Sequence, residues 1–307
     1  HPGLYEQVIN NALNRELSEV PETRKSTAPI DTAEASKVLA QYLTEVVQKG
    51  LDNVQDNGGG IEAQIALANQ IVSTIQTTTK EPDFAALGVD QRAEQLLALL
   101  RENDPRLATG KAAKDIERPE TSLAQSSLFT GAIHEPQMYT ELKKEIVSAD
   151  HIDMLVSFIK WSGLRLLMDE LRQFTQNGGE LRIITTSYMG ATDVKAIEEL
   201  RQLPNTKIKV SYDTKRTRLH AKTYVFYRDT GFTTAYVGSS NLSNAAISSG
   251  LEWNVKLTRK DLPETIDKIA ATFESYWNAG EFEYYDEGQR ERLARALKAE
   301  KYSETDH

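Results

Sequence analysis

The sequence predicts a two-part chain in which a small all-α region precedes an α/β domain with a mixed, largely parallel sheet flanked by helices. Apolar residues recur at helical spacing before residue 120, and strand and helix patterns alternate after residue 130. The length of 307 residues allows two domains of ordinary size. We therefore expect a helical domain over 1–120, a linker to about 130, and an α/β domain over 131–286.

The first part contains four stretches of helical periodicity, at residues 4–17, 33–54, 61–75 and 89–100. Three glycines from Gly58 to Gly60 break the pattern before the third stretch. Residues 103–131 combine proline, serine, threonine and many charges, which is typical of a linker. This part shows no residue pattern that suggests chemistry.

The second part begins with a βαβ pattern. Its members are a strand at 152–159, a helix at 164–174 and a strand at 181–186. A further helix at 193–203 and an extended stretch at 207–212 repeat it. Because helices connect these strands, we expect parallel pairing with right-handed crossovers.

The remaining elements are predicted to close the sheet and to leave a tail. Strand patterns at 219–228 and 232–237 flank Asp229-Thr230-Gly231, a hairpin signal. A strand at 253–257 and an amphipathic helix at 262–277 follow. Residues 287–307 are charged and are expected to form a helical tail leading to a further region.

Composition narrows the function classes. With 39% hydrophobic and 26% charged residues, no apolar run of membrane length and no signal-peptide order at its start, the chain is expected to be cytoplasmic and away from membranes. The absence of cysteine excludes disulfides, thiol nucleophiles and cysteine zinc sites. Five histidines leave little for a histidine-rich metal site, so we expect no bound metal.

The acidic charge is unevenly distributed. The net charge is −9, and residues 1–120 account for most of it, with 19 acidic against 12 basic side chains; residues 121–307 hold the other 26 and 24. A local basic cluster interrupts this acidity and consists of Lys207, Lys209, Lys215, Arg216, Arg218, Lys222 and Arg228. It runs directly into the residues that indicate chemistry.

His220 and Lys222 lie two apart in a strand pattern, so their side chains are expected on one face. An imidazole is able to attack phosphorus as a nucleophile, and an ammonium neutralises the phosphate oxygens as charge develops. Gly238-Ser239-Ser240-Asn241 follows the next strand and offers close backbone approach and neutral donors. Glu252 is placed to hold an imidazole in its useful tautomer. This set suits a phosphodiester and needs no metal.

These residues carry a family resemblance. His220-x-Lys222 followed by Gly238-Ser239-x-Asn241 resembles the signature of the phospholipase D superfamily, and Glu252 matches the acidic residue of its nucleases. Four wider stretches are similar to the amino-terminal nuclease-like module of bacterial superfamily II helicases of the DEAD/DEAH type; they are residues 155–163, 185–193, 211–220 and 250–254. The resemblance covers about 125–286.

The resemblance implies a phospholipase D-like α/β fold and a metal-independent phosphodiesterase that acts on DNA through a phosphohistidine. It also implies a helicase motor outside this chain. ATP and Mg²⁺ are expected only for that motor, and no cofactor is expected for the nuclease domain. The helical part is then a dimer arm, a DNA clamp or a dock for the motor, and its acidity disfavours the clamp.

The sequence departs from the family signature at two points. Tyr227 stands where the signature has Asp, five residues after Lys222, and Glu252 is the carboxylate that replaces it. Only one His-x-Lys is present, whereas the family's mechanism uses two histidines. Family members with one copy build the site across a homodimer, so a twofold dimer with both His220 side chains at its interface is expected.

Other interpretations remain open at the sequence level. Lys160, Arg216 and Arg218 are expected phosphate contacts, although such charges are often merely solvated. Ser239 and Asn241 are also suitable caps for a following helix. Two further functions compete with the nuclease: a catalytically degenerate DNA-binding module, favoured by Tyr227, and a phospholipid-processing enzyme. The latter is expected to show two signatures, an export signal or a membrane span, and none is visible.

Overall fold

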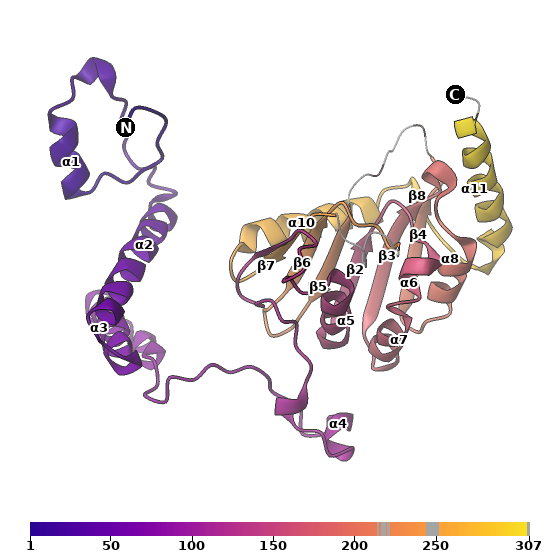
Figure 1. Cartoon of the computed structure of the whole chain (residues 1–307), viewed down its shortest axis with the longest axis horizontal. Helices are drawn as coiled ribbons and strands as arrows, with labels where there is room; N and C mark the ends of the chain where they lie inside the picture. Colours follow the sequence, from indigo (N-terminus) through magenta and orange to yellow (C-terminus); the bar gives the residue numbers. More distant parts are fainter. Residues whose placement is uncertain (214, 216–218, 220–221, 244–251, 306–307) are drawn as a thin grey trace. The chain divides into compact units, whose positions relative to one another are not determined.

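The structure is a computed structural model and describes residues 1–213, 215, 219, 222–243 and 252–305. The chain divides into two compact units, residues 1–102 and 103–307 (Figure 1). Each unit is described by itself. Within the described residues, no helix has both the length and the apolar character that crossing a bilayer requires.

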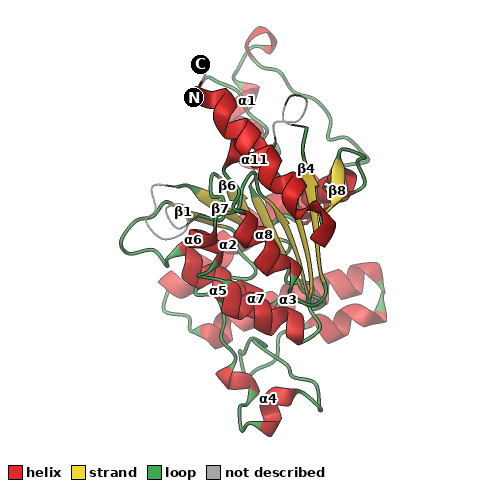
Figure 2. Cartoon of the chain, turned by 90° about the vertical axis from the view of Figure 1, so that its right-hand side faces the viewer, coloured by secondary structure: helices red, strands yellow, loops and turns green. Residues whose placement is uncertain are grey.

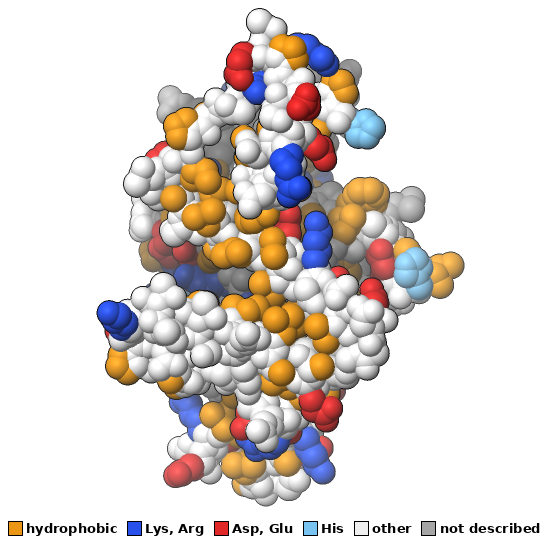
Figure 3. Space-filling view, turned by 90° about the vertical axis from the view of Figure 1, so that its left-hand side faces the viewer, with side chains coloured by type: hydrophobic (Ala, Val, Ile, Leu, Met, Phe, Trp, Pro, Cys, Tyr) orange, Lys and Arg blue, Asp and Glu red, His pale blue; other side chains and the backbone are white. Residues whose placement is uncertain are grey.

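The first unit is helical but builds no buried core. Its elements are α1 (Asn11–Ser18), η1 (Glu22–Arg24), α2 (Ala35–Asp56), α3 (Ile61–Thr79) and η2 (Pro82–Leu87). No side chain of these helices is fully buried, and large apolar residues stay at the surface (Figure 3). The prediction of a helix at residues 89–100 is wrong, because this stretch is irregular. Leu96 and Leu99 are more than 80% exposed, so the apolar side chains of this stretch have no surface to pack against.

The second unit contains a sheet of eight strands within the described residues. They are β1 (Ser127–Phe129), β2 (His151–Leu155), β3 (Glu180–Thr186), β4 (Thr206–Ser211), β5 (Thr223–Tyr227), β6 (Thr234–Gly238), β7 (Asn254–Thr258) and β8 (Phe282–Tyr284). Their order across the sheet is β1-β7-β6-β5-β2-β3-β4-β8. The predicted mixed α/β class is confirmed.

The sheet is less parallel than expected. Among the described strands, only β2 with β3 and β3 with β4 pair in parallel, and every other neighbouring pair is antiparallel. Parallel neighbours require a crossover, which helices supply only between these three strands. The predicted hairpin at Gly231 (φ 90°) makes β5 and β6 antiparallel instead.

Helices cover the sheet on both faces, and Figure 2 shows the larger group of helices in front of it. One face carries α5 (Met138–Ser148), α6 (Trp161–Leu164), α7 (Met168–Gln176), α8 (Val194–Arg201) and α11 (Arg290–Thr305); the other carries α10 (Pro263–Trp277). The alternation of β5 shows this division, because Tyr224 and Phe226 face the larger core while Val225 faces α10. The predicted single helix at 164–174 is two helices, α6 and α7, and α5 was not predicted.

Part of the expected linker belongs to the second unit. Pro119 is buried, and the Glu141 carboxylate of α5 accepts hydrogen bonds from the backbone N–H groups of Glu120 (2.7 Å) and Thr121 (3.2 Å). Lys256 of β7 donates to the Thr121 hydroxyl at 2.9 Å. A buried carboxylate needs such donors. Residues 119–121 are therefore held to α5 and β7 by this polar network.

The carboxyl-terminal helix α11 packs against this unit. Leu293 and Leu297 are buried in the larger core, beside α8 and η4 (Tyr188–Gly190). Gly190 has a φ of 61°, and a Cβ there would lie 2.4 Å from the Leu297 carbonyl oxygen. The expected tail is thus a packed helix of the second unit.

The topology brings several chain segments to one edge of the sheet. The carboxyl ends of β2 and β6 and the amino ends of β5 and β7 all lie there, because β5 runs against β2 and β7 runs against β6. Leu155, Thr223 and Val237 form one row across three of these strands. Every described residue of the predicted site lies at or just beyond this row.

Candidate functional site

The turn after β6 begins at a glycine that no other residue replaces without strain. Gly238 donates its N–H to the Lys222 carbonyl at 3.2 Å. A Cβ at Gly238 would lie 2.3 Å from the Trp253 carbonyl oxygen, and contacts that short do not occur. The glycine therefore allows the segments at Lys222, Gly238 and Trp253 to lie side by side.

Asn241 ties this turn to the loop after β2. Its side chain is almost fully buried, and its amide oxygen accepts hydrogen bonds from the backbone N–H groups of Ser157 (3.0 Å) and Phe158 (3.3 Å). Because this oxygen is occupied, the amide nitrogen is the group of Asn241 that suits a phosphate oxygen. The other interpretation of Asn241 was that it caps a following helix. The observed partners of its amide oxygen are Ser157 and Phe158 instead.

Ser240 holds the turn from within. It is fully buried, and its hydroxyl accepts a hydrogen bond from the Asn254 amide at 2.7 Å. The Tyr224 hydroxyl donates to the Ser240 carbonyl at 2.8 Å. These two bonds connect the turn to β5 and β7, so the turn is held by both neighbouring strands.

Lys222, Ser239 and Glu252 lie around this turn. Ser239 is exposed, and its N–H donates to the Trp253 carbonyl at 3.3 Å, which places Glu252 one residue away. Burial, and after it the negative charge of Glu252, raise the pKa of Tyr224 well above its ordinary value. The carboxylate of Glu252 therefore lies near the Tyr224 hydroxyl that holds the turn.

Lys160 joins the same edge from the loop after β2. Its N–H donates to the Leu242 carbonyl at 2.8 Å, one residue beyond Asn241. His220, Arg216 and Arg218 lie outside the described residues. The structure thus brings together the described members of the predicted site: Lys160, Lys222, Ser239, Asn241 and Glu252.

The basic cluster seen in the sequence is only partly a surface feature. Lys209 is buried and donates to the Trp277 carbonyl. Arg228 is also buried, at 2.9 Å from the Glu145 carboxylate. Both charges are therefore used inside the domain, whereas Lys207 and Lys215 are exposed.

Tyr227 lies away from the site. It ends β5, about 13 Å along the strand from Thr223 at roughly 3.3 Å per residue. Its ring lies 5.2 Å from that of His151, and burial, with the neighbouring Asp153 carboxylate, raises its pKa. Asp153 is itself buried and paired with Arg182 at 2.9 Å. The departure from the family signature thus concerns the opposite end of the strand.

Three supporting residues were not identified from the sequence: Ser157, Tyr224 and Asn254. Ser157 is buried beyond β2, and its hydroxyl donates to the Leu219 carbonyl, one residue before His220. The signal for Ser157 was a serine directly after an apolar strand, where sheet edges often carry sites. The hydroxyl of Tyr224 and the amide of Asn254 gave no such signal.

Among the residues that the structure describes, no group of three or more His, Asp or Glu side chains is placed to hold a metal ion.

A family model described as "Cardiolipin synthase, PLD-like domain" matches residues 142–277. This range contains the sheet edge and every residue of the candidate site. The part of the second unit that carries the candidate site is therefore similar to this family model. No curated protein sequence shows significant similarity to the chain.

Solved structures that are similar to parts of this chain include the following three. NucT from Helicobacter pylori is 22% identical, with a TM-score of 0.40, over 49% of this chain and 94% of its own. Nuc from Salmonella typhimurium, a phospholipase D family member, is 20% identical, with a TM-score of 0.41, over 52% of this chain and 99% of its own. A phosphatidylserine synthase from Haemophilus influenzae matches at 12% identity and a TM-score of 0.38, over 58% of this chain and 46% of its own.

Proposed function

We propose that the phospholipase D-like domain is a metal-independent phosphodiesterase that cleaves DNA. The observation that carries this proposal is the convergence of Lys222, Ser239, Asn241 and Glu252 on one turn at the sheet edge. Leu219, which is bonded to Ser157, and Lys222, which is bonded to Gly238, are at this edge. The nucleophilic role of His220 is part of the proposal.

The chemistry follows from two imidazoles. A ring nitrogen of His220 attacks phosphorus, and the P–O bond to the leaving oxygen breaks while that oxygen takes a proton from the His220 of a second copy. The product is a phosphohistidine. The second His220, now neutral, removes a proton from water, and the resulting hydroxide displaces the first His220 from phosphorus.

The other residues stabilise the charge that develops. The Lys222 ammonium and the Asn241 amide nitrogen are suited to the non-bridging oxygens, with Ser239 as a further donor from its exposed position. Glu252 is suited to hold an imidazolium by its charge. Such fixed donors typically contribute about 10²–10³ in rate each.

A homodimer is part of the proposal, and the surface beside the site supports it. Leu128 pairs with Val255, and Val255 pairs with Val237, so three apolar residues form a row across β1, β7 and β6. Leu128 is 47% exposed, and Trp253, on the same side of β7, is 62% exposed. Apolar rows of this kind mark contact surfaces. A second copy seated here lies next to Glu252.

DNA is proposed as the substrate because basic residues lie in segments that meet at this edge. The backbone groups of Lys160 and Lys222 bond there to Leu242 and Gly238, and Arg216 and Arg218 precede Lys222 in the sequence. Phosphate contacts of this kind bind DNA without reading its sequence.

We also propose, from the resemblance of residues 155–163, 185–193, 211–220 and 250–254, that the domain works beside a helicase motor. The protein isolated from its native cell is then expected to carry, or to bind, a DNA-dependent ATPase. A native preparation without that ATPase contradicts the helicase setting and leaves the phosphodiesterase untouched.

The activity is tested with single-stranded, double-stranded and branched DNA in excess chelator. We expect cleavage by the native chain, and loss of cleavage in His220→Ala with DNA binding and oligomeric state preserved. Binding without cleavage, lost in Lys222→Ala, would instead establish a DNA-binding module. Hydrolysis of phospholipid vesicles with no action on DNA would establish the lipid enzyme.

A further inference from the structure

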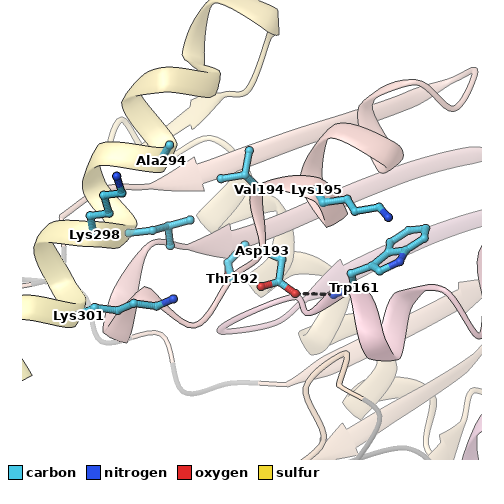
Figure 4. Close-up of a pocket in the computed structure, with 9 residues that line it drawn as sticks. Trp161, Thr192, Asp193, Val194, Lys195, Ala294, Lys298 and Lys301 are labelled. Atoms are coloured by element: carbon cyan, nitrogen blue, oxygen red, sulfur yellow. Dashed lines mark hydrogen bonds between the residues drawn. The ribbon is translucent and has the colours of Figure 1, made fainter.

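A pocket of about 450 Å³ opens between α6, α8 and α11 (Figure 4). Lys298 and Lys301 line it from α11, with Lys301 extending toward Asp193, and Trp161 and Lys195 form the opposite wall, with Thr192 and Asp193 between the two walls. Neither the phosphodiesterase chemistry nor the proposed dimer uses these residues. The lining of the pocket therefore has no role in the function proposed so far.

The lining combines positive charge with an aromatic surface. Three lysines face one carboxylate, Asp193, which is already engaged by the Trp161 backbone N–H at 2.8 Å. The Lys195 ammonium lies 4.6 Å from the centre of the Trp161 ring. A phosphate held by Lys195 thus brings the group attached to it against the indole. Phosphate together with a flat ring is the chemistry of a nucleotide.

The walls of the pocket are firmly held. The buried Leu297 fixes the α11 wall to the core, and α11 meets Gly190 so closely that no side chain fits between them. On the other wall, the Asp193 N–H donates to the Ile159 carbonyl at 2.8 Å. The lysines are thus presented across a fixed gap rather than by a loose segment.

The chain segment 158–161 links the pocket to the candidate site. Trp161 lies three residues after Phe158, so the Cα atoms of these two residues are at most about 11 Å apart. The N–H of Phe158 donates to the Asn241 amide oxygen. Gly163 of α6 also packs on the backbone of Ser243, since a Cβ there would lie 2.4 Å from the Ser243 nitrogen. Trp161 is therefore within reach of a strand of a few nucleotides bound at Asn241.

We propose that this pocket is a subsite for a flanking nucleotide of a single nucleic-acid strand, with Trp161 stacking on its base and Lys195, Lys298 and Lys301 holding its phosphates. The assignment rests on the proposed function, because it places the scissile phosphate at the turn around Asn241. A strand is favoured over a free nucleotide because the 158–161 segment joins the pocket, at Trp161, to Phe158, the partner of Asn241.

The test is binding of a fluorescent 12-nucleotide single strand by the full chain, followed by anisotropy across a salt series in chelator. Lys298→Ala/Lys301→Ala is expected to weaken binding about tenfold at low salt and to lower the slope of log K against log salt by about 1.4, since each lost contact to a single strand removes about 0.7. Trp161→Leu is expected to weaken binding about five- to a hundredfold through lost stacking.

The control is Lys207→Ala/Lys268→Ala, which removes the same charge from exposed positions on β4 and α10. Hydrolysis of bis(p-nitrophenyl) phosphate, which is too small to span both places, is expected to be unchanged in Lys298→Ala/Lys301→Ala. That result together with weaker strand binding supports the subsite. Equal strand binding by the pocket and control variants overturns the subsite, whether or not the small diester is hydrolysed.

A mononucleotide arm separates the two sources of the ligand. Inorganic phosphate and a 5′-mononucleotide are added as competitors of the labelled strand. Weak competition, at millimolar concentration only, supports a strand subsite. Competition by the mononucleotide as strong as that by the unlabelled strand overturns it in favour of a free-nucleotide site. If the native chain does not hydrolyse the small diester, the proposed phosphodiesterase activity is contradicted. The strand-binding measurements still decide whether the pocket is a subsite.

Discussion

Gly238 and Asn241 fix the candidate turn at the residue scale by opposite means. Gly238 does so by lacking a side chain, which leaves space for the Trp253 carbonyl. Asn241 does so by an amide oxygen that satisfies two backbone donors from another loop. The sequence predicted both residues as site members, but it did not predict the division of Asn241 into a structural oxygen and a donor nitrogen.

Gly238→Ala is expected to lower the free energy of unfolding by about 1–3 kcal/mol and to reduce phosphodiesterase activity, because the added methyl group pushes β7 away from the turn. Thermal unfolding and initial rates measure the two effects. Gly280→Ala is the matched control, since a Cβ at Gly280 meets no atom within 4 Å. Equal effects in the two variants would contradict the close approach at Gly238.

Asn241→Asp and Asn241→Ala are expected to differ. The aspartate still accepts from Ser157 and Phe158, so stability is retained, but its charge repels phosphate and activity is lost. The alanine leaves two N–H groups without their acceptor, which costs about 1–3 kcal/mol for each group that stays buried. Unfolding midpoints and rates separate these effects. An active Asn241→Asp would contradict the donor role.

At the scale of elements, the two ends of β5 have different roles: one end borders the candidate site, and the other packs in the domain. Lys222 precedes its first residue and contacts the candidate turn, whereas Tyr227 ends it beside Asp153 and Arg182. The missing signature aspartate therefore removes no group from the turn. This weakens the argument for a degenerate site that rests on Tyr227 alone.

Tyr227→Phe is expected to change kcat/KM by less than about twofold, because it removes only a hydroxyl far from the reacting phosphate. Lys222→Met, which removes an ammonium at the other end of β5, is expected to lower it by about a hundredfold or more. Steady-state rates on one DNA substrate give both values. A hundredfold loss in Tyr227→Phe would place Tyr227 in the chemistry.

Another link between elements depends on pH. Glu198 of α8 accepts from the Tyr285 hydroxyl, after β8, and from Arg201 at 3.0 Å. Burial raises the pKa of Glu198, but these two partners together lower it below its ordinary value. A carboxyl whose pKa is lowered by folding stabilises the fold above its unfolded pKa, near 4.5, and loses that contribution as pH falls through the folded value.

Glu198→Gln is therefore expected to be less stable than the native chain at neutral pH, with a difference that shrinks as the pH falls below about 4.5. Unfolding midpoints between pH 3 and 7 measure this. Glu199→Gln, an adjacent carboxyl on the same helix, is the control. A difference that is independent of pH would show that the charge of Glu198 is not what matters.

At the scale of the whole molecule, local patterns predicted most strands of the second unit and the hairpin, because apolar runs and a glycine turn are short-range signals. They did not predict the antiparallel majority of the sheet or the role of residues 119–129. Both depend on partners far along the chain, as when Thr121 meets Glu141 and Lys256. The site residues were predictable as types, but their shared edge required the topology.

The proposed dimer gives a whole-molecule prediction. Val255→Glu places a charge in the apolar row with Leu128 and Val237, so sedimentation is expected to shift toward one chain and DNA cleavage to fall with it. Lys268→Glu, an exposed change on α10, is the control. A native chain that sediments as one copy at micromolar concentration would contradict the shared two-histidine site.

In the proposed mechanism, His220 forms a covalent intermediate in a site completed by a second copy. To detect this intermediate, native protein is mixed with a DNA substrate in chelator, the reaction is stopped in alkaline denaturant, where a phosphohistidine persists, and protein–DNA adducts are counted by mass. We expect one adduct per dimer, attached at His220 and absent from His220→Ala. Cleavage without any adduct, or an adduct that persists in His220→Ala, would contradict it.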